Sequence, residues 1–160
     1  MATSSIPEGM NEKEYYETVV SEEEFLRWYK EQDHPTYENP SVTTDMVAYC
    51  FVEGRLKLLV IRRKTHPCQH RVALVGGFLQ KHEDAIQACI REVQEEVGLE
   101  LTHQKVEQLM TVSTPGRDPR GWVITIAHLV YLPAEAVNLV RAGDDAKEVL
   151  FLDVDFKQGE

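Results

Sequence analysis

Residues 76–99 read GGFLQKHEDAIQACIREVQEEVGL, and this stretch decides how the rest of the chain is interpreted. From about residue 83 to residue 97, apolar side chains recur at helical spacing and share one arc of a helical wheel: Ala85, Ile86, Cys89, Ile90, Val93 and Val97. We therefore predict a helix from about Glu83 to Val97 whose apolar arc faces the core. Gly98 follows directly and is suited to end the helix in the left-handed conformation.

Three glutamates near the end of this helix need an explanation. Glu92, Glu95 and Glu96 lie three and four residues apart, so their side chains leave neighbouring rows of the helix. Like charges at this spacing repel, and acids near a helix C-terminus oppose the helix dipole. Glu96 also falls at the edge of the apolar arc, where an unpaired charge would be partly desolvated. A solvated acidic face is the simpler alternative, but a divalent cation bound by these oxygens would relieve all three penalties, and Arg91 is placed to pair with one glutamate.

The complete pattern is more specific than its parts. Gly77 is followed after five residues by Glu83 and, after seven more, by the run from Arg91 to Leu99. This order resembles the Nudix box, a motif of the Nudix (MutT-like) hydrolases, at every specified position. The resemblance implies an α/β protein: the Nudix fold, a mixed β-sheet in an α/β/α sandwich, with the box as its loop-helix-loop.

The resemblance also implies a reaction and a cofactor. Family members hydrolyse a pyrophosphate bond in a nucleoside diphosphate linked to another group, with Mg²⁺ as cofactor and Mn²⁺ as an alternative. The implied metal ligands are Glu92, Glu95 and Glu96, together with a backbone carbonyl of Gly76 or Gly77. Arg91 matches the arginine that orients these glutamates. Glu83 matches the glutamate that supports the loop or contacts the metal through water.

Four short segments outside the box resemble one branch of the family, the ADP-ribose pyrophosphatases and the related NrtR-type regulators. They are TDMV at 44–47, RR at 62–63, RDPRG at 117–121 and AGDDA at 142–146. This branch implies that ADP-ribose is cleaved to AMP and ribose 5-phosphate. The guanidinium groups of Arg62, Arg63, Arg117 and Arg120 are suitable donors to its diphosphate.

Alternatives remain for these segments and for the function. RDPRG also fits a rigid turn whose arginines pair with Asp118 or face solvent. Glu148 fits either a general base or a solvated loop residue. A house-cleaning pyrophosphohydrolase for oxidised nucleoside triphosphates is a second enzyme candidate. A non-catalytic ADP-ribose sensor is a third candidate, but such regulators carry a winged-helix domain, which we do not expect in a chain that ends at Glu160.

The remaining chain divides into three parts. Residues 1–20 are polar and without a clear period, and we expect them to be mobile. Residues 21–40 contain a short helix, opened by a capping box at Ser21, and a linker. The aromatic stripe of this helix, Phe25, Trp28 and Tyr29, is expected to pack on the main domain or on a second copy in a homodimer. Residues 41–160 form the Nudix domain, with strands expected at 42–52, 56–63, 72–78, 106–114, 122–132 and 149–155, and a loop or short helix at 134–148.

Composition limits the partners. The chain has 160 residues and a net charge of −10, which argues against non-specific binding to nucleic acid or to an anionic membrane. Its longest uninterrupted apolar run, residues 46–52, is too short to span a bilayer. Three cysteines do not form a disulfide framework, and no signal-peptide pattern opens the chain. We therefore expect a cytoplasmic protein whose partner is a small-molecule nucleotide.

Overall fold

The computed structural model describes residues 6–35, 37–101, 106–143 and 146–155. By their internal contacts the residues form two compact units, Met1–Glu38 and Asn39–Glu160, which we call the N-terminal and C-terminal units. Among the described residues, no helix combines the length and the apolar character needed to cross a bilayer.

The N-terminal unit contains two short helices, α1 (Glu12–Thr18) and α2 (Glu22–Glu31). The predicted capping box at Ser21 is confirmed, because its side chain and that of Glu24 bond each other's backbone N–H groups. Helix α1 was not expected from the sequence; the Asn11 side chain caps it. Trp28 of α2 stacks on Tyr16 of α1, with ring centroids 4.8 Å apart and an angle of 2° between the rings. Trp28 of the aromatic stripe therefore packs within its own unit. The contact predicted for the stripe, with the main domain or with a second copy, stays a prediction.

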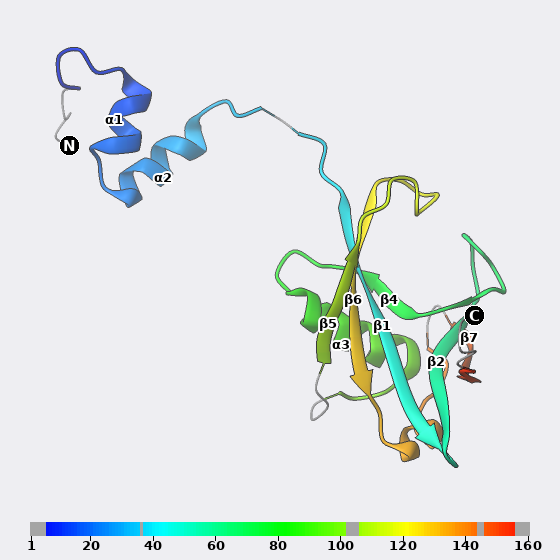
Figure 1. The fold of residues 1–160 in the computed structure, drawn as a ribbon. Helices are drawn as coiled ribbons and strands as arrows, with labels where there is room; N and C mark the ends of the chain where they lie inside the picture. Colours follow the sequence, from blue (N-terminus) through cyan, green and yellow to red (C-terminus); the bar gives the residue numbers. More distant parts are fainter. Residues whose placement is uncertain (1–5, 36, 102–105, 144–145, 156–160) are drawn as a thin grey trace, which may run out of the picture. The chain divides into compact units, whose positions relative to one another are not determined.

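The C-terminal unit is built on a mixed seven-stranded sheet (Figure 1). Its strands are β1 (Ser41–Val52), β2 (Arg55–Arg63), β3 (Val72–Ala73), β4 (Val75–Phe78), β5 (Val106–Val112), β6 (Val123–Tyr131) and β7 (Ala146–Asp153). The order is β3-β2-β1-β6-β5, with β4 added to β1 and β7 added to β2. β1 and β6 run parallel, and the other pairs are antiparallel. The predicted fold class, an α/β fold built on a mixed sheet, is confirmed.

β1 and β2 form the predicted hairpin. The two turn residues, Glu53 and Gly54, have φ values of 51° and 77°, the left-handed conformation that a two-residue hairpin turn requires. The two strands pair only near the turn, where residues 49–52 of β1 lie opposite residues 55–58 of β2. Farther along, β4 takes over the edge of β1. The hairpin therefore opens toward the beginning of β1.

The predicted strand at 72–78 is two strands with different partners. β3 pairs with β2, whereas β4 pairs with β1. This division places Gly76 and Gly77 inside a strand, opposite Asp45 and Thr44 of β1. A continuous apolar run does not reveal such a change of partner, because the change depends on how far the hairpin opens.

The central helix of the box is α3 (Ala85–Val97), which packs on one face of the sheet (Figure 1). It begins two residues later than predicted because Asp84 acts as its N-cap in a capping box with Gln87. It ends at Gly98 with φ 67°, as predicted. Ile86, which we had assigned to the core, is 41% exposed, and Ala88 is buried in its place.

The core lies between α3 and the sheet. Its buried side chains include Met46, Leu59, Ile61, Val75, Cys89, Val93 and Val97. The segment before β7 secures the end of α3, because the Arg141 N–H donates to the Val97 carbonyl at 2.8 Å and the Gly143 N–H donates to the Glu96 carbonyl at 2.7 Å. Asp144 and Asp145 of the AGDDA segment lie outside the described residues. Residues 134–138 form a short 3₁₀ helix, η1 (Ala134–Asn138), in the segment predicted as a loop or short helix.

Candidate active site

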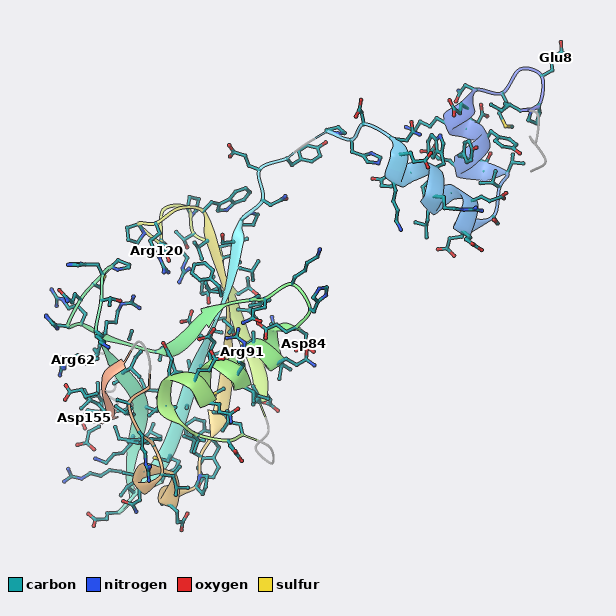
Figure 2. All side chains as sticks on the ribbon, turned by 180° about the vertical axis from the view of Figure 1, so that it is seen from behind. Glu8, Arg62, Asp84, Arg91, Arg120 and Asp155 are labelled. Atoms are coloured by element: carbon teal, nitrogen blue, oxygen red, sulfur yellow. The ribbon has the colours of Figure 1, made fainter. Side chains whose placement is uncertain are left out.

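A cleft of about 640 Å³ opens where β1 begins. It is bordered by β1, by β4 and the loops on either side of it, by α3, by the loop after β2 and by the β5–β6 loop. Its charged lining residues are Asp45, Arg63, Glu92, Glu96, Arg117, Asp118 and Arg120. Figure 2 shows Arg120 on the β5–β6 loop and Arg91 on α3. The cleft therefore brings carboxylates and arginines together from segments that are far apart in the sequence.

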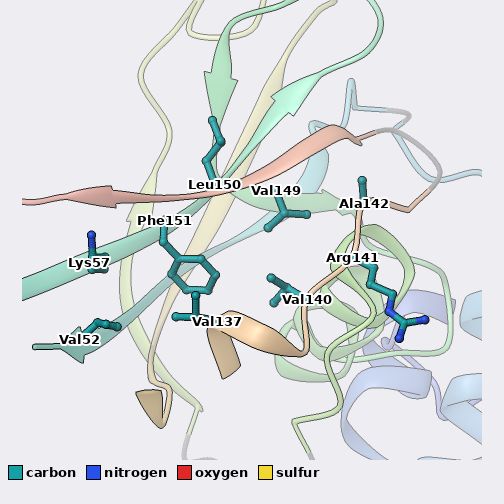
Figure 3. Close-up of a pocket in the computed structure, with 9 residues that line it drawn as sticks. All are labelled: Val52, Lys57, Val137, Val140, Arg141, Ala142, Val149, Leu150 and Phe151. Atoms are coloured by element: carbon teal, nitrogen blue, oxygen red, sulfur yellow. The ribbon is translucent and has the colours of Figure 1, made fainter. Parts of the chain in front are cut away.

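A second pocket lies between η1 and β7 and is different in character (Figure 3). It is lined by Val52, Lys57, Val137, Val140, Arg141, Ala142, Val149, Leu150 and Phe151. None of these residues is acidic. The cleft at the start of β1 is therefore the better candidate for metal and phosphate chemistry.

Arg91 is the centre of the carboxylate cluster. Its Nη1 donates to Glu92 Oε1 at 2.6 Å and to Glu95 Oε2 at 3.0 Å. Its Nη2 donates to Glu83 Oε1 at 2.6 Å and to the carbonyl oxygen of Phe78 at 3.0 Å. Hydrogen bonds to these acids, above all to Glu83, raise the arginine's pKa, so the guanidinium stays charged. The predicted pairing of Arg91 with a glutamate is confirmed, and it extends to three of them.

Glu83 joins this cluster to the loop before α3. It accepts two hydrogen bonds from Arg91 and one, at 2.7 Å, from the backbone N–H of Gln80. The hydrogen bonds from Arg91 lower the pKa of Glu83 and outweigh the opposing effect of burial. The carboxylate thus holds the loop against the helix.

Each of the paired glycines contacts one of the glutamates. A Cβ atom on Gly77 would lie 2.3 Å from Cδ of Glu92, so only glycine allows the carboxylate to approach the strand this closely. The backbone N–H of Gly76 donates to Glu96 Oε2 at 3.2 Å. Glu96 is 7% exposed, which confirms the predicted partial desolvation. The predicted ligand role of a glycine carbonyl stays a prediction.

The donor atoms of the cleft fit an oxygen-preferring divalent cation. Glu92, Glu96 and Asp45 present carboxylates to the same cleft, and carboxylate oxygens are the ligands that Mg²⁺ and Mn²⁺ prefer. Within the described part of the chain, however, no three His, Cys, Asp or Glu side chains are gathered closely enough to hold a metal. Arg91 contacts both Glu92 and Glu95, and the Glu95 side chain is 51% exposed. The carboxylates are thus of the type that the cation prefers, while Arg91 contacts two of the predicted ligands.

The four arginines that we predicted to bind substrate have different surroundings in the structure. Arg63 and Arg117 line the cleft. Arg62 is not among the lining residues; it pairs with Glu148 and donates to the carbonyl oxygen of His70 at 3.0 Å. We had expected Arg62 to bind substrate, but adjacent residues of a strand point to opposite faces, so Arg62 and Arg63 do not both enter the cleft. Glu148 is consequently an ion-pair partner of Arg62.

Arg120 reaches the cleft already paired. Its Nε and Nη2 donate to the two carboxylate oxygens of Asp118 at 3.0 and 2.7 Å. These bonds lower the pKa of Asp118 to about 2. The guanidinium carbon also lies 5.0 Å from the ring centroid of Phe78. For this arginine the structure matches the rigid-turn alternative.

Sequence reasoning gave no role to Asp45 or Phe78, although both line the cleft. Asp45 accepts a hydrogen bond from the Thr125 hydroxyl of the neighbouring parallel strand. A signal for it was present, because a carboxylate within a strand that is otherwise apolar or hydroxylated is costly to bury without a purpose. Phe78 directly follows the paired glycines, but its 42% exposure was not predictable from its apolar character.

The fold and the site together define the class of protein: an α/β domain in which an acidic helix lies against a glycine strand at a cleft lined with arginines. The chain belongs to the Nudix family, because residues 42–155 match the NUDIX domain model.

Its similarity to particular relatives is consistent with this family. An ADP-ribose pyrophosphatase of Methanocaldococcus jannaschii is 40% identical over 119 residues, which cover 74% of this chain and 64% of that protein. An ADP-ribose-responsive transcriptional repressor of Acinetobacter baylyi is 32% identical over 72% of this chain and 45% of its own length. The crystal structure of a MutT/nudix family protein from Enterococcus faecalis superposes with a TM-score of 0.86 at 41% identity, over 96% of this chain and 59% of that one. The chain thus spans less than two thirds of the length of these relatives.

Proposed function

We propose that this protein is a Nudix hydrolase that uses a divalent cation, Mg²⁺ or alternatively Mn²⁺, to cleave the pyrophosphate bond of ADP-ribose or a close relative. The observation that carries this proposal is the meeting of Glu92 and Glu96 with the arginines Arg63 and Arg117 in a single cleft. Carboxylates suit the cation, and arginines suit the diphosphate. The similarity to the archaeal ADP-ribose pyrophosphatase supports the choice of substrate.

The proposed ligands of the cation are Glu92, Glu95 and Glu96, with a carbonyl of Gly76 or Gly77. When bound, the cation supplies charge neutralisation of the diphosphate and lowers the pKa of a coordinated water. Arg91 and Glu83 are proposed as positioning residues, because their hydrogen bonds fix the carboxylates and the preceding loop. The presence of Arg91 against two ligands also makes it a counter-charge that limits repulsion between them.

Arg63 and Arg117 are the proposed donors to the diphosphate. Arg63 is fixed through its Nε, which donates to the carbonyl oxygen of Pro67 at 2.7 Å. In the reaction a water oxygen bonds to one phosphorus while the bridging P–O bond breaks. The bridging oxygen leaves with the other phosphate, and the water proton is released. For ADP-ribose the products are AMP and ribose 5-phosphate.

A substrate panel tests the proposal. The chain is incubated with Mg²⁺, with Mn²⁺ or with a chelator, and with ADP-ribose, dinucleoside polyphosphates or oxidised nucleoside triphosphates. We expect ADP-ribose to be hydrolysed fastest, and only with metal. Fast hydrolysis of an oxidised triphosphate beside negligible turnover of ADP-ribose would overturn the substrate and favour a house-cleaning enzyme.

A second function is favoured by one finding, the similarity to the Acinetobacter repressor. A chain with that role would bind ADP-ribose without hydrolysing it. Measuring both the calorimetric Kd of ADP-ribose and its rate of hydrolysis distinguishes the two functions. Tight binding with no AMP released in the presence of either metal supports the sensor.

Arg117→Ala tests the diphosphate contact. A donor that acts mainly in ground-state binding affects KM more than kcat, so we expect KM for ADP-ribose to rise with a smaller change in kcat. The matched control is Arg55→Ala, which removes an arginine at the hairpin turn whose side chain is 76% exposed. An equal effect of both substitutions would contradict the assignment.

We also propose that the protein acts in the cytoplasm. Cys50, Cys68 and Cys89 are all unpaired, as expected where thiols stay reduced. Measurement of the thiol content of protein isolated from its own cells tests this, and a disulfide-linked form would contradict it.

A further inference from the structure

The mouth of the cleft carries an arginine and an aromatic ring that the proposed chemistry does not use. Arg120 and Phe78 both line the cleft, and the guanidinium carbon lies 5.0 Å from the ring centroid. The residue Phe78 is 42% exposed, and the side chain of Arg120 is 45% exposed. The guanidinium thus lies over the Phe78 ring, and both side chains remain partly exposed at the cleft.

The Asp118 carboxylate fixes the guanidinium in this position. Besides the two bonds to the guanidinium, Asp118 Oδ1 accepts from the backbone N–H of Arg120 at 2.9 Å. The Asp118 side chain is only 11% exposed, so little of the carboxylate faces solvent. An arginine with three hydrogen bonds to a single residue two positions away is pre-organised in one orientation.

This pairing makes Arg120 a poor choice for the diphosphate. The carboxylate uses the guanidinium's two-pronged donor edge, which is the edge that recognises phosphate. It also cancels the arginine's charge at short range, and an approaching diphosphate would be repelled by Asp118. The cleft offers Arg63 and Arg117 for that role. What Arg120 still offers is its flat face, and guanidinium planes and aromatic rings both stack on nucleobases.

We infer that Phe78 and the Asp118-held guanidinium of Arg120 form one stacking surface for the purine base of the substrate. The surface lies beside the proposed reaction centre, since Phe78 follows Gly77, the residue against which the Glu92 carboxylate packs. Arg120 and Phe78 are thereby specificity residues, and Asp118 is a positioning residue. This inference rests on the proposed function, because it takes a purine nucleotide as the ligand.

The test compares a ligand that has a base with one that lacks it. Calorimetry with Mg²⁺ gives the Kd of AMP and of ribose 5-phosphate for the full chain, and their ratio measures what the base contributes. Phe78→Leu keeps apolar bulk but removes the ring, and Arg120→Lys keeps the charge but removes the plane. Stacking of one base changes affinity by a factor of about 5 to 150. Each variant should therefore raise the Kd of AMP by a factor in this range and leave the Kd of ribose 5-phosphate unchanged.

Three further variants control the interpretation. Phe78→Tyr keeps the ring and should retain the preference for AMP. Val72→Ala removes an exposed apolar residue of the same cleft and should also retain it. Asp118→Asn keeps the shape of the side chain but weakens its hold on the Arg120 guanidinium. The preference for AMP over ribose 5-phosphate should therefore fall, but by less than in Arg120→Lys. Melting temperatures establish that each variant is folded.

Two results would overturn the inference. If Arg120→Lys weakens AMP and ribose 5-phosphate equally, the arginine binds phosphate. If Phe78→Leu leaves the ratio unchanged, the ring does not stack on the base. In both cases wild-type hydrolysis of ADP-ribose leaves the proposed function intact. A wild-type chain that neither binds AMP nor hydrolyses any nucleotide overturns the proposed function and this inference together.

Discussion

Replacing Gly77 by alanine would place a methyl group 2.3 Å from both Cδ and Oε1 of Glu92. Ordinary contact begins near 3.4 Å, so the carboxylate must retreat by about 1 Å. The retreating group is the far end of a flexible side chain, which can rotate away without moving the backbone. The perturbation therefore acts on the proposed metal ligand and leaves the fold largely undisturbed.

The two expected effects differ in size. A misplacement of about 1 Å in a reacting constellation costs roughly 100-fold in rate, and we expect kcat for ADP-ribose to fall by about this factor. The fold loses part of the 2.6 Å hydrogen bond between Arg91 and Glu92. It regains about 0.4–1 kcal/mol because alanine restricts the unfolded chain more than glycine does. The free energy of unfolding should thus change by no more than about 1 kcal/mol.

The neighbouring glycine is the matched control. A Cβ on Gly76 would lie 2.1 Å from the carbonyl oxygen of Thr44 and 2.9 Å from Cα of Asp45. These are backbone atoms of the paired strand β1, so no rotation of a side chain relieves the clash. Overpacking of this kind costs about 1–3 kcal/mol or more, and Gly76→Ala should lower the melting temperature by several degrees.

The assay pairs thermal unfolding with AMP release from ADP-ribose under saturating Mg²⁺. Gly77→Ala should melt near the wild-type temperature but turn over slowly, whereas Gly76→Ala should melt early. If Gly77→Ala kept wild-type turnover, or if both variants lost stability equally, the proposed link between the glycine strand and the carboxylate would be refuted.

Further predictions concern the glutamates, a buried histidine and the N-terminal helices. Glu95→Gln and Glu96→Gln keep shape but remove a charged oxygen, so turnover should fall by several orders of magnitude; near-normal turnover in both would refute the ligand assignment. Burial lowers the pKa of His128, so below about pH 6.5 the unfolded chain gains a proton that the folded one resists. The wild-type melting temperature should therefore fall between pH 7 and lower values more steeply than that of His128→Gln, and parallel curves would contradict this. Trp28→Ala removes the stack on Tyr16 and should speed proteolysis within residues 6–35; unchanged cleavage would show that the stack contributes little.

Local patterns in the sequence were enough to predict the central helix and much of the carboxylate cluster. Helical spacing gives the direction of most side chains on α3, with Ile86 and Ala88 as exceptions, so the burial of Glu96 and the pairing of Arg91 followed from their positions. The stop at Gly98 and the capping box at Ser21 are also local, because each depends on a few consecutive residues. The sequence likewise determined the family, since the box fixes residue types at fixed spacing.

Only the tertiary structure decided which side chains share the cleft. Arg62 and Arg63 are neighbours in sequence, but side chains alternate along β2, and β2 pairs with β7. Arg62 therefore forms an ion pair with Glu148, whereas Arg63 lines the cleft. Asp118 and Phe78 are forty residues apart and meet through Arg120 only because β4 and the β5–β6 loop both lie where β1 begins. The physical reason is that periodicity specifies the face of an element on which a side chain lies. What stands opposite that face depends on strand pairing and on how far the hairpin opens, and these are properties of the whole chain.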